Sequence, residues 1–470
     1  MQLLETLKRI VGDAHVLTGD DAAPFGKDWT GKYISTPLAV VRPATTQEVS
    51  AVVKTCSVAD VPIVPVSGNT GLSGGAYAEG AIMISLSRMN AIREIRPDAR
   101  VAIVDAGVVL SSLHEAVDAH DLVFPLFFGA RGSAMIGGVL STNAGGSNVL
   151  RYGNTRALCL GLEVVLPDGR IMDLMSELHK DNTGYDLKHL MIGAEGTLGL
   201  ITAAVLKLSP KPLAYATAMV ATPDLPGALS LLNQLQSATG GAVEAFEYMP
   251  RAYVERHIAR IPGAREPFDA PYDVNILVEV GATAPRDADV QPDGSVPVTN
   301  YLEEVLSGML EDGTVLDAVV AKSDGQRAQM WERRESAAEV TLTTPTLVDN
   351  DVSVPVDKVG TFLGRITERV QKLDPGAAEL TVSHLGDGNL HYTVFPNQTD
   401  AEHRDLIRQQ VEEVTRELGG SFSAEHGIGL TKLPSMTRNK DAVSMDVMRL
   451  IKAALDPKGI MNPGKVIPKV

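Results

Sequence analysis

The sequence predicts an α+β protein built from two mixed domains, and three observations lead to that prediction. The chain has 470 residues, which is long enough for two or three domains. Residues 1–210 combine short apolar strands with several glycine-rich turns, which we expect to converge on a ligand. From about residue 211, amphipathic helical periods alternate with strands instead. We therefore expect a ligand-binding domain followed by a second α+β domain.

The composition is that of an ordinary globular protein, with 44% hydrophobic and 21% charged residues. The formal net charge of −16 argues against a nucleic-acid partner, because phosphates would repel the chain. Two cysteines, Cys56 and Cys159, cannot form a disulfide framework and indicate a reducing compartment. Residues 1–13 lack a signal peptide's apolar core, and no apolar run is long enough to span a bilayer. We expect a cytoplasmic protein, and peripheral docking on a membrane stays open.

A capping box marks the first long helix after the N-terminal segment. Thr45 is followed three residues later by Glu48, and apolar residues then recur at helical spacing until Pro62 ends the helix. A hairpin is expected to turn at Asp168-Gly169. The other elements predicted in this half are strands at 63–66, 81–86 and 101–108, a helix at 110–120 and hairpin strands within 162–174.

The most unusual stretch is 129–156, where seven glycines alternate with small or hydroxyl-bearing residues. Glycine costs about 1 kcal/mol relative to alanine inside a helix, so this composition favours backbone that lies close to a flat or polar ligand. A glycine-rich surface loop is the alternative, but it does not explain the apolar residues between 135 and 140. We expect main-chain N–H groups here to hold a large cofactor with phosphates.

A second glycine-rich turn at 67–75 follows a strand and supports the same interpretation. It lacks the G-x-G-x-x-G spacing, so the dinucleotide-binding Rossmann fingerprint is not met. Alone it would be weak support for a cofactor site, but its pairing with 129–156 is stronger. Further glycine and hydroxyl turns lie at 180–187 and 193–199, and the second of these leads into a strand.

The second half alternates helices and strands around one polar, proline-rich loop at 282–297. Residues 333–344 begin with a helical pattern and end in β-branched residues. The tail forms a helix that stops at Asp456-Pro457. The remaining predictions are helices at 225–239, 300–310, 357–373 and 401–418, a strand at 272–280 and a strand–loop–strand unit at 379–395.

Two histidine clusters in this half indicate a metal site. His384 and His391 flank a glycine turn, and Glu425 and His426 lie in a second glycine-flanked motif. Two imidazoles and one carboxylate form a ligand set for a divalent metal that leaves coordination positions open for substrate. Each histidine taken alone would more often be structural, but three of the ten in two such clusters favour function.

Arginines beside Trp331 offer a second kind of site. Arg333 and Arg334 are adjacent guanidinium groups, and one of them could bind a carboxylate through two hydrogen bonds. A solvated helix face explains the same residues equally well. The sequence leaves these two alternatives open.

Several long motifs resemble known flavoproteins. PVSGNTGLSGG (65–75), FGARGSAMIGGVLSTNAGGSNVLRYG (128–153) and KDNTGYDLKHLMIGAEGTLGLIT (180–202) resemble the FAD-binding half of the FAD-linked oxidases of the vanillyl-alcohol-oxidase type. HLGDGNLH (384–391), SAEHGIG (423–429) and LDPKGIMNPGK (455–465) resemble its metal-containing D-2-hydroxyacid dehydrogenase branch. The resemblance extends from about residue 30 to residue 466 and is closest to the D-2-hydroxyglutarate dehydrogenases.

The resemblance implies a two-lobed FAD-binding domain and an α+β substrate, or cap, domain. It implies an N-terminal helical segment at 1–34, the FAD domain at 35–212, the cap domain with the metal site at 213–430, and a C-terminal helical segment at 431–470 packing back on the FAD domain. The FAD is expected to be non-covalent, because the first glycine loop has Ser67-Gly68-Asn69 where covalent relatives often carry a histidine. The implied cofactor-binding residues are Pro65, Ser67, Gly68, Asn69, Thr70, Gly71, Gly132, Ser133, Gly137, Gly138, Thr142, Asn143, Gly145, Gly146, Tyr152, Gly153, Glu195, Gly196, Gly199, Ile201 and Asn462.

The resemblance also implies a reaction, the oxidation of a D-2-hydroxy acid to the 2-oxo acid. His384, His391 and Glu425 match the ligands of a divalent metal, with Zn²⁺ expected. His426 matches the catalytic base. Arg334 and Asn389 match substrate-binding positions.

Two positions depart from the hydroxyglutarate enzymes. Asp349 stands where a lysine is expected, and Thr393 stands where an asparagine is expected. Both count against a five-carbon diacid and keep D-lactate dehydrogenase and glycolate oxidase activities as alternatives.

The reduced flavin needs an electron acceptor, and the family resemblance favours an electron-transferring flavoprotein or a quinone. Direct oxidation by O₂ is a rival within enzymes. A catalytically inactive metal- or flavin-binding module is a rival of another class, although the retained ligand set and base argue against it. We also expect a homodimer.

Overall fold

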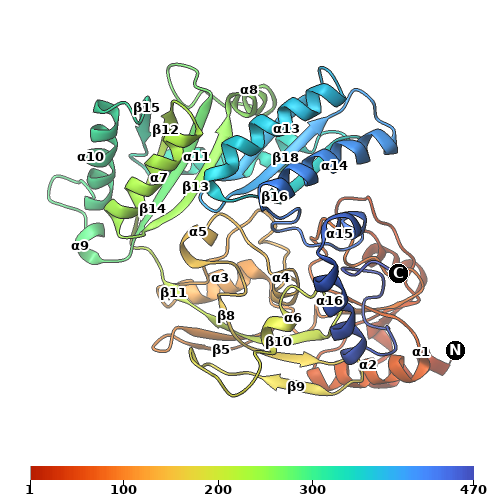
Figure 1. Cartoon of the computed structure of the whole chain (residues 1–470). Coiled ribbons are helices and arrows are strands. Elements are labelled where there is room, and N and C mark those ends of the chain that lie inside the picture. Colours follow the sequence, from red (N-terminus) through yellow and green to blue (C-terminus); the bar gives the residue numbers. More distant parts are fainter. Residues whose placement is uncertain (1, 470) are drawn as a thin grey trace. The chain divides into compact units, whose positions relative to one another are not determined.

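The computed structural model describes residues 2–469, and these form two compact units (Figure 1). The first unit contains the chain up to Gly145, Gly153–Pro210 and the segment from Glu425 onward. The second unit contains Lys211–Ala424 together with the short segment Gly146–Tyr152. The chain therefore leaves the first unit for seven residues in the middle of the glycine-rich stretch.

The first unit is built on two larger sheets and one small one. Its four-stranded sheet has the order β1-β2-β4-β3, and β4 runs parallel to both of its neighbours. Its five-stranded antiparallel sheet has the order β5-β6-β10-β8-β9, and β11 pairs with β7. The strands are β1 (Val16–Leu17), β2 (Ala39–Val41), β3 (Ile63–Val66), β4 (Ile82–Ser85), β5 (Ile92–Arg96), β6 (Val101–Asp105), β7 (Leu122–Val123), β8 (Cys159–Val165), β9 (Ile171–Leu174), β10 (Leu200–Lys207) and β11 (Ser209–Pro210).

The capping box that the sequence predicts opens α2 (Thr46–Ala59). The Thr45 hydroxyl accepts from the N–H of Glu48, and the Glu48 carboxylate accepts from the N–H of Ala44. The helix ends when Asp60 adopts a left-handed conformation, before Pro62 is reached. The other helices of this unit are α1 (Gln2–Val11), α3 (Leu110–Asp118), α4 (Ile136–Thr142), α6 (Lys188–Met191), α15 (Leu433–Asn439), α16 (Ala442–Leu455) and the 3₁₀ turns η1 (Asp13–His15), η2 (Gly19–Asp21) and η3 (Ala23–Gly26).

The C-terminal segment lies beside β3 within the first unit. The N–H of Ile63 donates to Ile460, and the N–H of Asn462 donates back to Ile63. Lys452 on α16 donates to the backbone carbonyls of Thr197 and Met461. The two Ile63 bonds join residues 460–462 to β3, the strand that precedes the first glycine loop.

The second unit is organised around one seven-stranded antiparallel sheet with the order β15-β12-β14-β13-β17-β18-β16. Its three longest strands are buried along nearly their whole length, as expected for strands that are covered on both faces of a sheet. The strands are β12 (Ala214–Thr222), β13 (Val243–Pro250), β14 (Val274–Ala282), β15 (Asp317–Val320), β16 (Val348–Ser353), β17 (Ala378–His384) and β18 (Asn389–Phe395).

Helices cover both faces of this sheet. One face packs in a large apolar cluster with α7, α10, α13 and α14. The opposite face packs in a smaller cluster with α8, α11 and α12. The helices and turns are α5 (Val149–Tyr152), α7 (Leu225–Thr239), α8 (Arg251–Arg260), α9 (Pro285–Ala288), α10 (Pro297–Glu311), α11 (Asp324–Glu335), α12 (Ala337–Thr341), η4 (Val356–Lys358), α13 (Val359–Leu373) and α14 (Ala401–Glu417).

The α+β prediction is confirmed, with local differences. The polar loop at 282–297 contains the single turn α9, and the β-branched end of 333–344 is helical where it forms α12. Burial explains α12, because Val340 and Thr341 are both buried and tertiary packing overrides their weak helix propensity.

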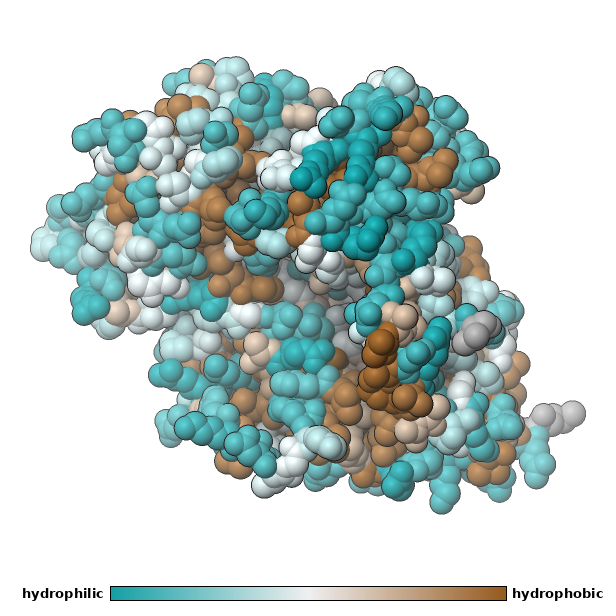
Figure 2. Space-filling view, in the orientation of Figure 1, coloured by the Kyte–Doolittle hydropathy of each residue, from teal (hydrophilic) through white to brown (hydrophobic). Residues whose placement is uncertain are grey.

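The surface of the first unit carries an apolar stripe on α16. Val443, Val447 and Leu450 recur at helical spacing and are all exposed, and apolar residues gather over this helix in Figure 2. No helix among residues 2–469 combines the length and the apolar character needed to cross a membrane.

Candidate functional site

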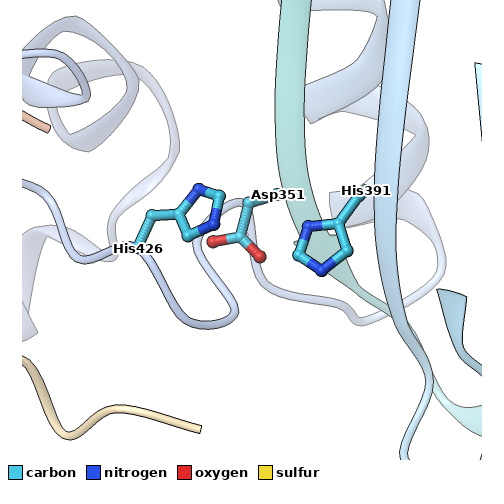
Figure 3. Close-up of side chains that lie close together, drawn as sticks. All are labelled: Asp351, His391 and His426. Carbon is cyan, nitrogen blue, oxygen red and sulfur yellow. The ribbon is translucent and has the colours of Figure 1, made fainter. Parts of the chain in front are cut away.

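Strand alternation places the histidines of the HLGDGNLH motif on the less covered face of the second unit's sheet. On β18, Leu390, Tyr392 and Val394 enter the large apolar cluster, so His391 points to the opposite face. Asp351 on β16 is the direct cross-strand partner of His391. Figure 3 shows the Asp351 carboxylate beside the His391 ring.

His384 ends β17, and its ring centroid lies 5.5 Å from that of His391. Its Nδ1 atom is 2.9 Å from the Glu247 carboxylate, which is only 1% exposed. A carboxylate on Nδ1 fixes the orientation and the tautomer of the His384 ring.

Arg334 on α11 completes this buried cluster. Its Nε donates to Glu247 at 2.7 Å, and its Nη2 lies 3.4 Å from both ring nitrogens of His384. Burial alone would raise the pKa of the Glu247 carboxyl, but His384 and Arg334 together hold that pKa below its usual range. Glu247 is therefore an anion that orients an imidazole and a guanidinium at once.

Asn389 supplies an unsatisfied oxygen to the same face. Its Nδ2 donates to the Asp351 carboxylate and to the Val352 carbonyl, both at 3.0 Å, which fixes the amide's orientation. Its Oδ1 is buried and has no hydrogen-bond donor. An orphaned acceptor costs free energy unless a cation or a donor occupies the space in front of it.

This donor set fits a divalent metal. Imidazole nitrogens with carboxylate and amide oxygens suit borderline cations such as Zn²⁺, and the carboxylate behind His384 is the usual support of a metal-bound histidine. The predicted ligands His384 and His391 are brought together by the turn between β17 and β18. The third predicted ligand, Glu425, is the first residue of the first unit's last segment and directly follows Ala424, whose N–H donates to Asp351.

The first unit contains a backbone cradle made by the two predicted glycine-rich segments. A β-carbon at Gly68 would overlap the carbonyl oxygen of Ser133, so only glycine allows these two backbones to pack together. By contrast, nothing lies within 4 Å of the position that a β-carbon would take at Gly71 or Gly132. The two backbones thus pack closely at Gly68 and leave space beside Gly71 and Gly132. A cofactor with phosphates needs such space next to main-chain N–H groups.

Strained backbone gathers at predicted cofactor residues. Asn69, Asn143, Glu195 and Asn462 are four of the eight non-glycine residues with positive φ in the described part of the chain. Such conformations persist where surrounding contacts fix them, and they cluster at ligand sites. Asn462 also keeps a buried Oδ1 without a donor, although its Nδ2 donates to Gly75 and Glu195.

His426 lies on a loop that is anchored within the first unit. The Ser73 hydroxyl donates to the His426 carbonyl at 3.0 Å. The two Glu195 carboxylate oxygens accept the N–H groups of Ile428 and Gly429 at 2.7 and 2.8 Å. Burial raises the pKa of the Glu195 carboxyl above its usual value, and the two N–H donors oppose that shift.

Two predicted cofactor residues belong to the second unit, because the segment Gly146–Tyr152 folds onto β13. The Tyr152 hydroxyl and the Arg151 guanidinium both contact Glu244 at 2.7 Å, and Arg151 also donates to Gly281. Among the other predicted residues, Pro65 lies in β3 next to Gly196, and Ile201 lies in β10. Every other predicted cofactor residue belongs to the first unit.

Sequence reasoning missed Glu247 and Asp351 as site residues. A signal existed for Glu247, since an acidic residue in a strand as apolar as β13, which has only Glu244 and Glu247 as charged residues, is buried only when it is paired. Asp351 carried a similar signal in β16, where Asp349 and Asp351 are two residues apart and therefore share one face of the strand.

Two family profiles match the chain. Residues 37–175 match the one described as "FAD binding domain", and residues 211–466 match the one described as "FAD linked oxidases, C-terminal domain". The second match alone covers more than half of the chain.

Curated relatives match at full length. The chain is 34% identical to a D-2-hydroxyglutarate dehydrogenase of Stutzerimonas stutzeri, over 99% of this chain and 98% of the relative. It is 31% identical to a D-2-hydroxyglutarate–pyruvate transhydrogenase of Saccharomyces cerevisiae, over 95% and 90%. A solved p-cresol methylhydroxylase shares the fold, with a TM-score of 0.75, 16% identity and coverage of 99% and 96%.

Proposed function

Because this chain belongs to the FAD-linked oxidases, a family of flavoprotein oxidoreductases, we propose that it oxidises D-2-hydroxyglutarate to the 2-oxo acid. The observation that carries the proposal is the His384–Glu247–Arg334 cluster beside His391 and Asn389. That cluster joins metal-type ligands to a guanidinium that can bind a carboxylate. The full-length similarity to D-2-hydroxyglutarate dehydrogenases supports the choice of substrate.

FAD is held by the first unit's glycine loops in this proposal. The main-chain N–H groups of 67–71 and 132–146 would bind its diphosphate, as oriented backbone amides bind anions elsewhere. Ser67-Gly68-Asn69 offers no histidine for a covalent link, which supports non-covalent binding.

His384, His391 and Glu425 would hold the divalent metal, with Zn²⁺ the best match to two imidazoles and a carboxylate. The N–H of Ala424 donates to the Asp351 carbonyl, which ties the residue preceding Glu425 to the strand that faces His391. When bound, FAD supplies a hydride acceptor and the metal supplies Lewis-acid polarisation of the substrate hydroxyl.

The remaining tasks fall to side chains of the chain itself. His426 accepts the hydroxyl proton as general base, the role in which histidine is used most often. Arg334 binds the substrate carboxylate and so orients the carbon that loses hydride. Glu247 accepts from Nε of this guanidinium and so fixes its orientation. The unsatisfied Oδ1 of Asn389 is an acceptor, so it would face the substrate hydroxyl and not the carboxylate.

A D-2-hydroxy acid with a shorter or uncharged tail is the second candidate substrate. Asp349 and Thr393 are cross-strand partners on the face that carries His391, and the Thr393 hydroxyl donates to the Asp349 carboxylate at 3.1 Å. Two residues along a strand span about 7 Å. A second carboxylate that extended toward this pair would meet like charge, whereas a methyl group or a hydrogen would not.

Reoxidation of the flavin requires a further partner. An electron-transferring flavoprotein or a quinone is the proposed acceptor, and the yeast relative's name adds pyruvate as an alternative. Steady-state assays with each acceptor, after reduction by the substrate, distinguish these three.

Anaerobic bleaching of the bound flavin tests the proposed function. D-2-hydroxyglutarate, D-malate, D-lactate and glycolate are mixed separately with the FAD-loaded protein, with L-2-hydroxyglutarate as the control. We expect D-2-hydroxyglutarate to bleach the flavin fastest and its L-enantiomer to leave it oxidised. Faster bleaching by D-lactate or glycolate would favour the second candidate. If none of these acids bleaches the flavin although dithionite reduces it, the proposed reaction is wrong.

A further inference from the structure

The loop that carries His426 is fixed to the first unit by two residues from distant parts of the sequence. Ser73 donates its hydroxyl to the His426 carbonyl, and its own carbonyl accepts the N–H groups of Leu430 and Thr431. Glu195 accepts the two N–H groups that lie between those contacts. Residues 426–431 are therefore held at successive backbone groups within one compact unit.

We propose that Glu195 is a positioning residue that holds the 425–429 loop, and with it the imidazole of His426, in its reactive place. The inference rests on the proposed function, because it takes His426 as the base. It differs from the sequence-based prediction for Glu195, which assigned that residue to cofactor binding.

The geometry requires a carboxylate at this position. Adjacent N–H groups of Ile428 and Gly429 point at the two oxygens of one carboxylate, and hydrogen bonds to an ionised acceptor are about twice as strong as neutral ones. A glutamine would present one acceptor and one donor, so its NH₂ group would face a backbone N–H. Glutamate is therefore the residue that satisfies both donors.

Glu195 is itself held in place by contacts that do not involve the loop. Its N–H donates to the Ser141 carbonyl, and its carbonyl accepts from Asn462. These bonds keep it in a left-handed conformation, with φ of 51°. Because both the N–H and the carbonyl of Glu195 are hydrogen-bonded, its backbone is rigid. Its side chain can therefore hold the loop's N–H groups in a fixed place.

The loop's composition agrees with this role. A β-carbon at Gly427 would lie 2.8 Å from the Glu195 carboxylate, and Gly427 has a φ of +72°. One at Gly429 would overlap the Ser73 carbonyl. The glycines on both sides of Ile428 thus allow the close approach of the two anchors, which explains the G-I-G sequence after His426.

Glu195→Gln tests the proposal in the FAD-loaded, metal-loaded protein. We expect the rate constant for flavin reduction by saturating D-2-hydroxyglutarate to fall roughly 10- to 100-fold, since displacing a catalytic group by about 1 Å has effects of this size. FAD content and the flavin spectrum should be unchanged. Glu79→Gln is the matched control, because Glu79 accepts one backbone N–H, from Thr36, in an exposed part of the same unit. That control should reduce its flavin at the wild-type rate.

A double-mutant cycle separates positioning from a merely structural role. If Glu195 acts through His426, Glu195→Gln should slow reduction little further in a His426→Ala background. Full additivity of the two effects would overturn the inference. So would a Glu195→Gln variant that loses FAD affinity but, once saturated with FAD, is reduced normally, because that result assigns the side chain to the cofactor.

The same cycle distinguishes failure of the inference from failure of the proposed function. A His426→Ala protein that is reduced at the wild-type rate would reject His426 as the base, whatever Glu195 does. A slow His426→Ala protein beside a normal Glu195→Gln protein would reject only the positioning role.

Should Glu195→Gln fail to fold, Ser73→Ala is the second variant. It removes only the hydrogen bond from the Ser73 hydroxyl to the His426 carbonyl, and we expect it to slow flavin reduction about fivefold with unchanged FAD content. An unchanged rate in Ser73→Ala would then overturn the inference.

Discussion

A single buried carboxylate organises the candidate metal cluster at the scale of residues. Glu247 is 1% exposed, yet it stays ionised because His384 and Arg334 both bind it. Removing one member of such a cluster leaves the others buried without a partner, which costs more than the lost hydrogen bond alone. Glu247 should therefore control both metal affinity and substrate binding.

Glu247→Gln is expected to weaken Zn²⁺ binding about 10- to 100-fold, the usual effect of losing a carboxylate behind a metal-bound histidine. A competition titration with a chromogenic chelator measures this affinity. The KM for the substrate should rise as well, because Arg334 loses the anion that orients it.

Glu279→Gln is the matched control for that change. Glu279 is also buried and ion-paired, to Arg327, but it lies on β14, two strands away from β17. We expect it to lower stability without changing Zn²⁺ affinity. Equal losses of affinity in the two variants would mean that Glu247 acts only by stabilising the sheet.

The sequence predicted the histidines of this cluster but not the residues behind them. His384 and His391 share one short motif, so their proximity followed from a single turn. Glu247 lies 137 residues before His384 and reaches it only because β13 pairs with β17. Pairing between strands so far apart in sequence leaves no local signal in one chain.

The β17–β18 hairpin controls the spacing of the two histidines at the scale of elements. Its turn contains Gly386 and Gly388, and the two glycines differ in what a side chain would meet. At Gly388 φ is +79° and a β-carbon would overlap the backbone carbonyl of Val354. At Gly386 φ is ordinary and a β-carbon would meet only the flexible end of Leu150, at 2.7 Å.

Gly388→Ala should therefore lower the free energy of unfolding by about 1–3 kcal/mol and also reduce Zn²⁺ content, because relief of the overlap moves the hairpin. Gly386→Ala should cost clearly less, since Leu150 can change rotamer. Thermal unfolding and metal analysis of both purified variants measure the two effects. Similar losses in both variants would contradict this account of the turn.

The strands and helices were easier to predict from the sequence than the neighbours that pack against each of their faces. The alternating pattern of 389–395 gave a strand, and the apolar members Leu390, Tyr392 and Val394 do enter the large core. Which helices cover the opposite face depends on the packing of α8, α11 and α12. That packing brings Arg334 to His384, a neighbour that sequence spacing could not reveal.

At the scale of the whole molecule, the chain is divided into two compact units and passes between them more than once. The sequence predicted the second domain at 213–430, whereas the compact unit contains Lys211–Ala424 and also Gly146–Tyr152. The short excursion has the same glycine-rich composition as its surroundings. Only the contacts of Arg151 and Tyr152 with Glu244 assign it to the second unit, and such distant partners cannot be read from composition.

This division predicts that the two prosthetic groups can be removed separately. Most proposed FAD residues belong to the first unit, and both proposed metal imidazoles belong to the second. Dialysis against dipicolinate is expected to remove Zn²⁺ while the flavin absorbance persists. Flavin reduction by D-2-hydroxyglutarate should then slow on the order of 100-fold or more, because Lewis-acid polarisation is worth several kcal/mol and each 1.36 kcal/mol is a factor of ten. Added Zn²⁺ should restore the rate. Loss of flavin together with the metal would show that the units do not bind their cofactors independently, and an unchanged rate would remove the metal from the reaction.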